Sequence, residues 1–118
     1  MSALDTYQEI AVTTQSQGKL IVMLYDGAIK FLRMAIRCIE ENDAEGKGKY
    51  ISKAIDIIFE LNTVLDMEVG GEVATNLRSL YHFMGRHLSE ANIKQDTAMI
   101  KEVINLLDEL NQSWKAIT

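Results

Sequence analysis

Two histidines, His82 and His87, are the residues of this sequence best suited to binding a metal or moving a proton. Helical di-iron proteins supply Glu-x-x-His pairs, with a glutamate three residues before each histidine. Here Ser79 precedes His82 and Met84 precedes His87 at that spacing, so neither pair is present. A separation of five residues also turns the two histidines apart on a helix. We therefore expect no metal site.

Other residues that could carry chemistry have ordinary structural explanations. The single cysteine, Cys38, has apolar neighbours at helical spacing and is expected to be a small buried hydrophobe. The glycine-rich pieces EGKGK and VGGE match neither a P-loop nor a dinucleotide-binding fingerprint, and we interpret them as turns. Adjacent carboxylates such as Glu40 and Glu41 point apart on a helix. The chain is therefore predicted not to be an enzyme and to need no cofactor.

Composition restricts the classes of partner. The chain has 118 residues, a formal net charge of −5 and no proline. Nucleic-acid binding depends on clustered Lys and Arg, so nucleic acid is not expected as a partner. No run of about 18 apolar residues occurs, and the N-terminus lacks a basic stretch followed by an apolar one. We expect an intracellular protein that does not insert into membranes.

Four segments repeat apolar residues at steps of three and four, which predicts four amphipathic helices. The first spans residues 17–41, the second begins near Lys49, the third near Glu72, and the fourth carries Ile100 to Ile117. The core-facing stripe predicted for the first helix is Ile21, Leu24, Ala28, Phe31, Ala35 and Cys38. The stripe of the second helix is Ile51, Ala54, Ile58, Leu61 and Leu65. The third helix has Ala74, Leu77, Tyr81, Met84, Leu88 and Ala91, and the fourth has Ile100, Val103, Leu107, Leu110, Trp114 and Ile117. Short connections require antiparallel neighbours. The predicted fold is all-α: an antiparallel up-and-down four-helix bundle over residues 17–118, preceded by a short N-terminal arm, residues 1–16.

The first two helices carry more apolar residues than one core-facing stripe requires. The first adds Leu20, Met23, Tyr25, Ile29, Leu32, Ile36 and Ile39, and the second adds Tyr50, Ile57 and Val64. These residues either widen the core or form a groove for an amphipathic partner helix. Gly27 and Gly85, each inside a predicted helix, allow either close helix packing or the approach of a partner backbone.

With these residues in view, the sequence resembles the flagellar secretion chaperone FliS family over nearly everything from Tyr7 to Trp114. The resemblance is carried by SQGKLIVMLYDGAIKFL at residues 16–32, KAIDIIFELNTVL at residues 53–65, GGEVATNL followed by LYHFM, and the closing LLDELNQSW. Gln17 departs from the family, which commonly has proline after the serine. Proline at a helix start is favourable but not required.

The resemblance implies a cytoplasmic export chaperone that binds the C-terminal segment of flagellin one-to-one and blocks its premature polymerisation. The client would stay competent for type III export by the flagellar export apparatus. We expect the arm to cover part of the bundle, competing with client helices for apolar grooves beside the first two helices. The predicted partner-binding residues are Tyr7, Ile10, Leu24, Tyr25, Ile57, Leu61 and Val64. A homodimer is left open for the client-free protein, and the alternative is a structural module that uses these surfaces for self-association.

Overall fold

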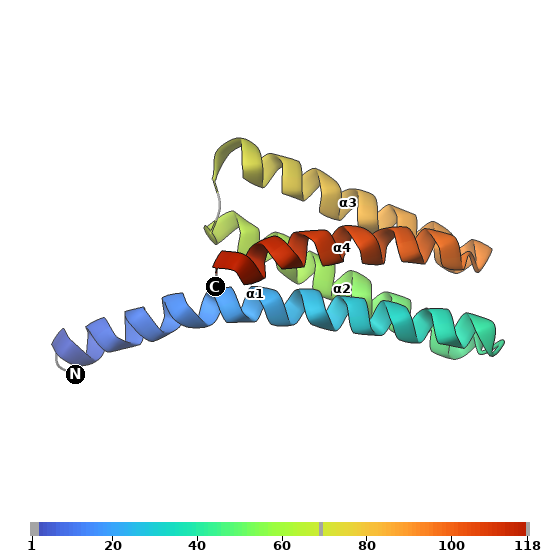
Figure 1. Ribbon diagram of the computed structural model, residues 1–118, viewed down its shortest axis with the longest axis horizontal. Coiled ribbons are helices and arrows are strands. Elements are labelled where there is room, and N and C mark those ends of the chain that lie inside the picture. The colour runs from blue at the N-terminus through green and yellow to red at the C-terminus, as the bar shows by residue number, and fades with distance from the viewer. Residues whose placement is uncertain (1–2, 69, 118) are drawn as a thin grey trace.

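Four long helices account for nearly all of the chain. The computed structural model describes the backbone of residues 3–68 and 70–117 and the side chains of residues 18–65 and 70–117. The helices are α1 (Ala3–Glu40), α2 (Ala44–Glu68), α3 (Gly71–Lys94) and α4 (Thr97–Ile117). Successive helices run antiparallel (Figure 1), and α1 packs on α2 and α4 while α3 packs on the same two. The predicted all-α four-helix bundle is confirmed.

The first helix begins earlier than the sequence pattern indicates. Its backbone is helical from Ala3, whereas we predicted a start at residue 17. In Figure 1 the N-terminal part of α1 projects beyond the ends of the other three helices. The side chains of residues 1–17 lie outside the described residues. Coverage of the bundle by the arm therefore stays a prediction.

Two nearly identical turns close the bundle at one end. Asn42, with φ 60°, follows α1, and Gln95, with φ 53°, follows α3. In each turn the next residue is an aspartate whose backbone N–H donates to a carbonyl five residues back, as in a Schellman motif. The same aspartate then caps the following helix: Asp43 Oδ1 accepts from the Gly46 N–H at 2.9 Å, and Asp96 Oδ1 accepts from the Ala98 N–H at 2.9 Å.

The cap at Asp43 explains why α2 begins at Ala44, five residues before the predicted Lys49. The sequence pattern predicts that the glycines of the segment NDAEGKGK belong to the turn. Gly46 and Gly48 instead lie inside the first turns of α2. Gly46 fits there because an added Cβ would lie 2.4 Å from Asp43 Oδ2 and 2.7 Å from Cys38 Sγ. The N-cap and the end of α1 thus leave no room for a side chain.

Alanine substitutions at these two glycines should have opposite effects on stability. Gly46→Ala displaces the capping carboxylate, and loss of an N-cap costs about 1 kcal/mol. Gly48→Ala meets nothing within 4 Å and gains helix propensity, which is expected to stabilise by up to about 1 kcal/mol. Urea unfolding of both variants measures the difference. Equal shifts of the same sign would contradict this packing of Gly46.

The buried core follows the predicted stripes in α2 and most of α3, and in α1 it follows four of the six predicted positions, Ile21, Ala28, Ala35 and Cys38. In α1 the fully buried side chains include Tyr25 and Leu32, whereas Leu24 and Phe31 are only half-buried. The prediction for the α1 stripe was therefore wrong at two positions, where Tyr25 is buried in place of Leu24 and Leu32 in place of Phe31. In α4 the stripe also shifts near its end, since Asn111 is buried and Ile117 is 75% exposed.

Among the helices that the structure describes, none is long and apolar enough to cross a membrane.

Candidate partner-binding surface

An outer seam between α1 and α2 leaves apolar side chains partly open to solvent. Leu24 of α1 and Ile57 and Val64 of α2 are half-buried. Leu20 and Met23, in the neighbouring turn of α1, are 43% and 67% exposed. We call these five residues the α1–α2 seam. Three of these five residues, Leu24, Ile57 and Val64, belong to the predicted partner-binding set.

The rest of the boundary between α1 and α2 is covered by long cationic side chains. Phe31 and Tyr50 stack with ring centroids 5.9 Å apart. The Lys53 ammonium lies 5.3 Å from the Phe31 ring centroid, and that of Lys49 lies 5.5 Å from the Tyr50 centroid. Such cation–π contacts shield the ring faces. A partner therefore meets less apolar surface here than at the α1–α2 seam.

Gly27 lies beneath the seam, under the side chain of Ile57. A Cβ at this position would lie 3.4 Å from Ile57 Cδ1, which is an ordinary van der Waals contact. The packing of α1 on α2 therefore has room for an alanine here, and the choice between close packing and the approach of a partner backbone stays a prediction. Gly85 differs, because an added Cβ there meets nothing within 4 Å.

Two of the predicted contact residues lie in the core. Tyr25 has no exposed surface and Leu61 is 2% exposed. In this structure a partner cannot touch either side chain, and both support the seam from within. Leu24, Ile57 and Val64 keep the exposure that partner binding requires. The side chains of Tyr7 and Ile10 lie outside the described residues.

The tyrosine hydroxyl at position 25 has a specific buried partner on α3. The hydroxyls of Tyr25 and Tyr81 lie 2.5 Å apart. Burial raises the pKa of the Tyr25 phenol and also that of Tyr81, so both stay protonated at neutral pH. The pair therefore joins helices that are diagonal in the bundle and offers no acid or base.

Removing one of these hydroxyls should destabilise the bundle. Tyr81→Phe leaves the Tyr25 hydroxyl buried beside an apolar ring edge, at an expected cost of about 1–3 kcal/mol. The double variant Tyr25→Phe/Tyr81→Phe should lose less than the sum of the single variants, because the two groups interact. Denaturant unfolding of the four proteins gives the coupling. Strict additivity would contradict a direct bond.

A second polar contact fixes α4 against α1. Asn111 is 1% exposed and its Nδ2 donates to Asp26 Oδ1 at 2.8 Å, while Lys115 Nζ lies 3.5 Å from the same oxygen. A buried asparagine that must meet its acceptor favours one register of packing. The carboxylate of Asp26 thus has a structural role beside the seam.

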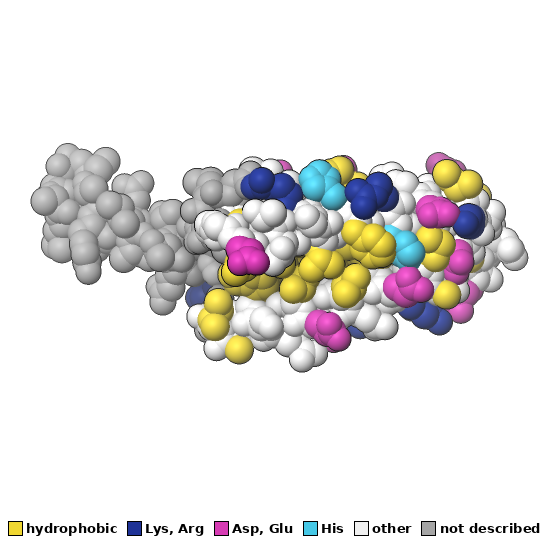
Figure 2. Space-filling view, turned by 90° about the horizontal axis from the view of Figure 1, so that it is seen from above, with side chains coloured by type: hydrophobic (Ala, Val, Ile, Leu, Met, Phe, Trp, Pro, Cys, Tyr) yellow, Lys and Arg dark blue, Asp and Glu magenta, His cyan; other side chains and the backbone are white. Residues whose placement is uncertain are grey.

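A second apolar band runs along the face shown in Figure 2, where hydrophobic side chains are bordered by charged ones. On α3, Phe83 is 39% exposed and stacks on His87 with ring centroids 4.9 Å apart. His87 Nε2 lies 2.7 Å from Glu102 Oε2 of α4. This histidine therefore joins two helices at the surface, consistent with a packing role.

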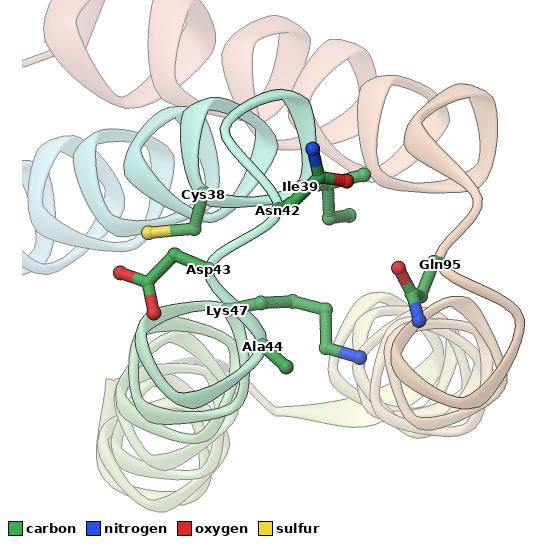
Figure 3. A pocket seen from close by; sticks show the side chains of 7 residues that line it. All are labelled: Cys38, Ile39, Asn42, Asp43, Ala44, Lys47 and Gln95. Atoms are coloured by element: carbon green, nitrogen blue, oxygen red, sulfur yellow. The ribbon is translucent and has the colours of Figure 1, made fainter.

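A polar pocket at the turn end of the bundle contains the ammonium group of Lys47. It has a volume of about 220 Å³ and is lined by Cys38, Ile39, Asn42, Asp43, Ala44, Lys47 and Gln95 (Figure 3). Lys47 is 9% exposed, and its Nζ donates to the Asn92 carbonyl of α3 at 2.9 Å. A cation is favourable at the C-terminal end of a helix. Burial, followed by the charge of Asp43, raises the pKa of the Cys38 thiol, which disfavours the reactive thiolate.

Within the described residues, no group of three or more His, Cys, Asp or Glu side chains could hold a metal ion.

Comparison with known proteins decides the family. The family model described as flagellar protein FliS matches residues 1–118, the whole chain. The chain belongs to the FliS family. Flagellar secretion chaperone FliS of Salmonella typhimurium is 45% identical over 111 residues, which cover 93% of this chain and 82% of that protein. The FliS proteins of Bacillus subtilis and Vibrio cholerae are 39% and 35% identical, covering 92% and 98% of this chain and 80% and 88% of the relatives.

Membership of the FliS family confirms the resemblance found in the sequence. It also confirms the prediction that the protein is a flagellar export chaperone rather than an enzyme. The family motif IVMLYDGAI, residues 21–29, supplies both Tyr25 and Asp26. In this structure Tyr25 pairs with Tyr81 inside the core, and Asp26 accepts a hydrogen bond from Asn111 at the edge of the core. The motif therefore builds the scaffold beneath the seam.

Sequence reasoning missed the long-range polar partners Tyr81 and Asn111. Tyr81 was assigned to the core, but without a partner for its hydroxyl. One signal was available for Asn111, which lies four residues after Leu107 on the apolar side of α4. A polar residue at such a position calls for a partner on a neighbouring helix.

Proposed function

We propose that this FliS-family protein acts in the bacterial cytosol and holds the C-terminal segment of flagellin in a one-to-one complex. The bound segment is masked, so it cannot polymerise before export, and it stays competent for the flagellar type III apparatus. Binding alone serves this purpose, so the proposal needs no cofactor. The flagellar export apparatus removes the client later.

The observation that carries the proposal is the apolar α1–α2 seam, which the bundle does not cover. A disordered client must be ordered on binding, and that ordering costs free energy. Preformed apolar area offsets the cost at about 25 cal/mol per Å² buried. Leu20 and Met23 are already exposed on a rigid helix, so the chaperone itself has little to reorganise. An amphipathic client helix suits such a seam.

In this proposal the N-terminal arm regulates access to the seam. Tyr7 and Ile10 would compete with client side chains for apolar grooves. A chain that lacks residues 1–16 should then bind a flagellin C-terminal peptide more tightly than the full chain does. Calorimetry compares the two affinities. Equal affinities would remove the arm from this role.

Isothermal titration of the full chain with a flagellin C-terminal peptide tests the proposed function. We expect saturation at one peptide per chain and a negative heat-capacity change, the mark of apolar burial. Circular dichroism should show a gain of helix when the peptide is added. No binding at micromolar concentrations would refute the proposal.

A further inference from the structure

The outer boundary between α1 and α2 changes chemical character along its length. At one end lies the apolar α1–α2 seam. Toward the turn end of the bundle, the same boundary carries the exposed side chains of Lys30 on α1 and of Lys49 and Lys53 on α2. The two α2 lysines lie over the stacked rings of Tyr50 and Phe31, and Lys30 directly precedes Phe31. We call Lys30, Lys49 and Lys53 the cationic strip.

The cationic strip has no acidic partner in the part of the chain whose side chains are described. No ion pair joins any of its three lysines to a described carboxylate. The chain has 17 acidic residues and 12 basic ones, so acidic partners are not scarce. Lys49 and Lys53 also stand four residues apart on one helix, where like charges destabilise the helix. A counter-charge supplied by a partner explains such an arrangement.

The ring contacts hold the two α2 lysines in place but leave their hydrogen-bond donors available. Neither Lys49 nor Lys53 donates a hydrogen bond to a described residue, whereas Lys47 is 9% exposed and donates to the Asn92 carbonyl. An ammonium group has three N–H donors, and a carboxylate is their strongest acceptor in a protein. Because the rings already order these two side chains, binding a carboxylate costs less conformational entropy.

The charge reverses along the outer side of α2. Lys49 and Lys53 are followed by Asp56 and Glu60, which are exposed on either side of the seam residue Ile57. The cationic strip therefore ends where the seam begins. A bound chain that carried acid along its whole length would be repelled at Asp56 and Glu60. Its acidic residues have to be confined to the part that lies over the cationic strip.

Helix geometry sets the distance between acidic and apolar residues in a bound helix. Along α2, the midpoint of Lys49 and Lys53 lies about nine residues before that of Ile57 and Val64, which is about 14 Å at 1.5 Å per residue. A helix that lies along this boundary therefore needs its acidic residues about two to three turns from the apolar residues that enter the seam.

We propose that the cationic strip selects the charge pattern of the client: an amphipathic helix whose apolar residues enter the α1–α2 seam carries Asp or Glu at one end, and these carboxylates bind Lys30, Lys49 and Lys53. The inference rests on the proposed function, because it describes the client of the same boundary. It also gives the client helix one direction, since the reversed helix takes its acidic residues away from the strip. Specificity comes from charge, and the seam supplies the apolar contribution to affinity.

Charge reversal tests the strip by calorimetry of the full chain with a flagellin C-terminal peptide. The double variant Lys49→Glu/Lys53→Glu should raise the dissociation constant at least about tenfold at low salt, and less at high salt, because exposed charges are screened. Lys30→Glu should act in the same direction. Lys101→Glu is the control on the exposed side of α4, whose described residues do not contact α2, and it should stay within about twofold. Strip variants that bind like the native chain would overturn this inference alone, whereas a native chain that does not bind would overturn the proposed function as well.

A neutral peptide separates charge recognition from a structural role of the lysines. Lys49→Glu/Lys53→Glu also removes the two ring contacts, whereas Lys30 makes none with a described ring, and circular dichroism should show that both variants stay helical. The second peptide has every Asp and Glu replaced by Asn and Gln. It should bind the native chain at least about tenfold more weakly than the acidic peptide does, and it should bind the strip variants as well as the native chain. Equal affinity of the two peptides for the native chain would overturn the inference, and so would an equal loss of both peptides in the strip variants.

Discussion

Ile57→Asp should weaken binding of a flagellin C-terminal peptide by about 10- to 100-fold while the bundle stays helical. Burying an isoleucine side chain contributes about 1.5–3 kcal/mol, and each 1.4 kcal/mol is a tenfold change in affinity. Aspartate loses this contribution and adds a charge that the client must desolvate. Because Ile57 is half-buried, a carboxylate can turn toward water in the free protein. Calorimetry and circular dichroism of the same samples measure both effects.

Phe59→Asp is the matched control for this experiment. Phe59 lies two residues away on α2, is 51% exposed, and lines a separate groove with His82 and Arg86 of α3. The same charge introduced there should leave peptide affinity within about twofold, since the site is remote from the α1–α2 seam. If both variants weaken binding equally, the seam has no special role and net charge explains the loss.

Leu61→Asp should unfold much of the protein rather than weaken binding alone. Leu61 is 2% exposed, and the variant would bury a carboxylate in an apolar site. Loss of the leucine contacts costs about 2–5 kcal/mol before the charge is considered, against a typical total stability of 5–15 kcal/mol. Burial raises the pKa of such a carboxyl, so the deficit should shrink as pH falls and the group becomes neutral.

Thermal unfolding of Leu61→Asp beside Leu61→Met provides the comparison. The methionine variant keeps similar volume and should lose less than about 1.5 kcal/mol. A Leu61→Asp protein that melts like the native chain would show that Leu61 is accessible. That result would return it to the set of residues able to contact a partner.

The sequence predicted the four helices and the core of α2 correctly because those stripes leave one choice. Ile51, Ala54, Ile58, Leu61 and Leu65 are all buried as expected. In α1, however, two stripes shifted by one residue are equally apolar. The folded bundle buries Tyr25 and Leu32, and no periodicity within α1 could reveal that choice.

The start of α2 was missed for a local reason. Four residues with turn preference, Asn42, Asp43, Gly46 and Gly48, precede Lys49, and their number suggested a long connection. A single aspartate cap is enough to begin a helix that contains two glycines. Asp43 was visible in the sequence as a capping residue, so this boundary could have been predicted from local chemistry.

Half of the candidate site could be predicted, since surplus apolar positions identify α1 and α2 as the helices involved. Ile57 and Val64 remain half-buried, in agreement with the expected second stripe. The burial of Tyr25 depends on a hydroxyl of α3, 56 residues away in the sequence. Exposure is a property of the assembled bundle, and spacing along one helix does not determine it.

Methyl NMR of the native chain most directly tests whether the α1–α2 seam receives the flagellin C-terminal segment. Isoleucine and valine methyl groups would be labelled, and unlabelled peptide would be added to saturation. We predict shifts at Ile57 and Val64 that saturate at one peptide per chain, with Ile93, which is 83% exposed at the far end of α3, unchanged. Saturation with no shift at Ile57 or Val64 would contradict the assignment of the seam as the client site.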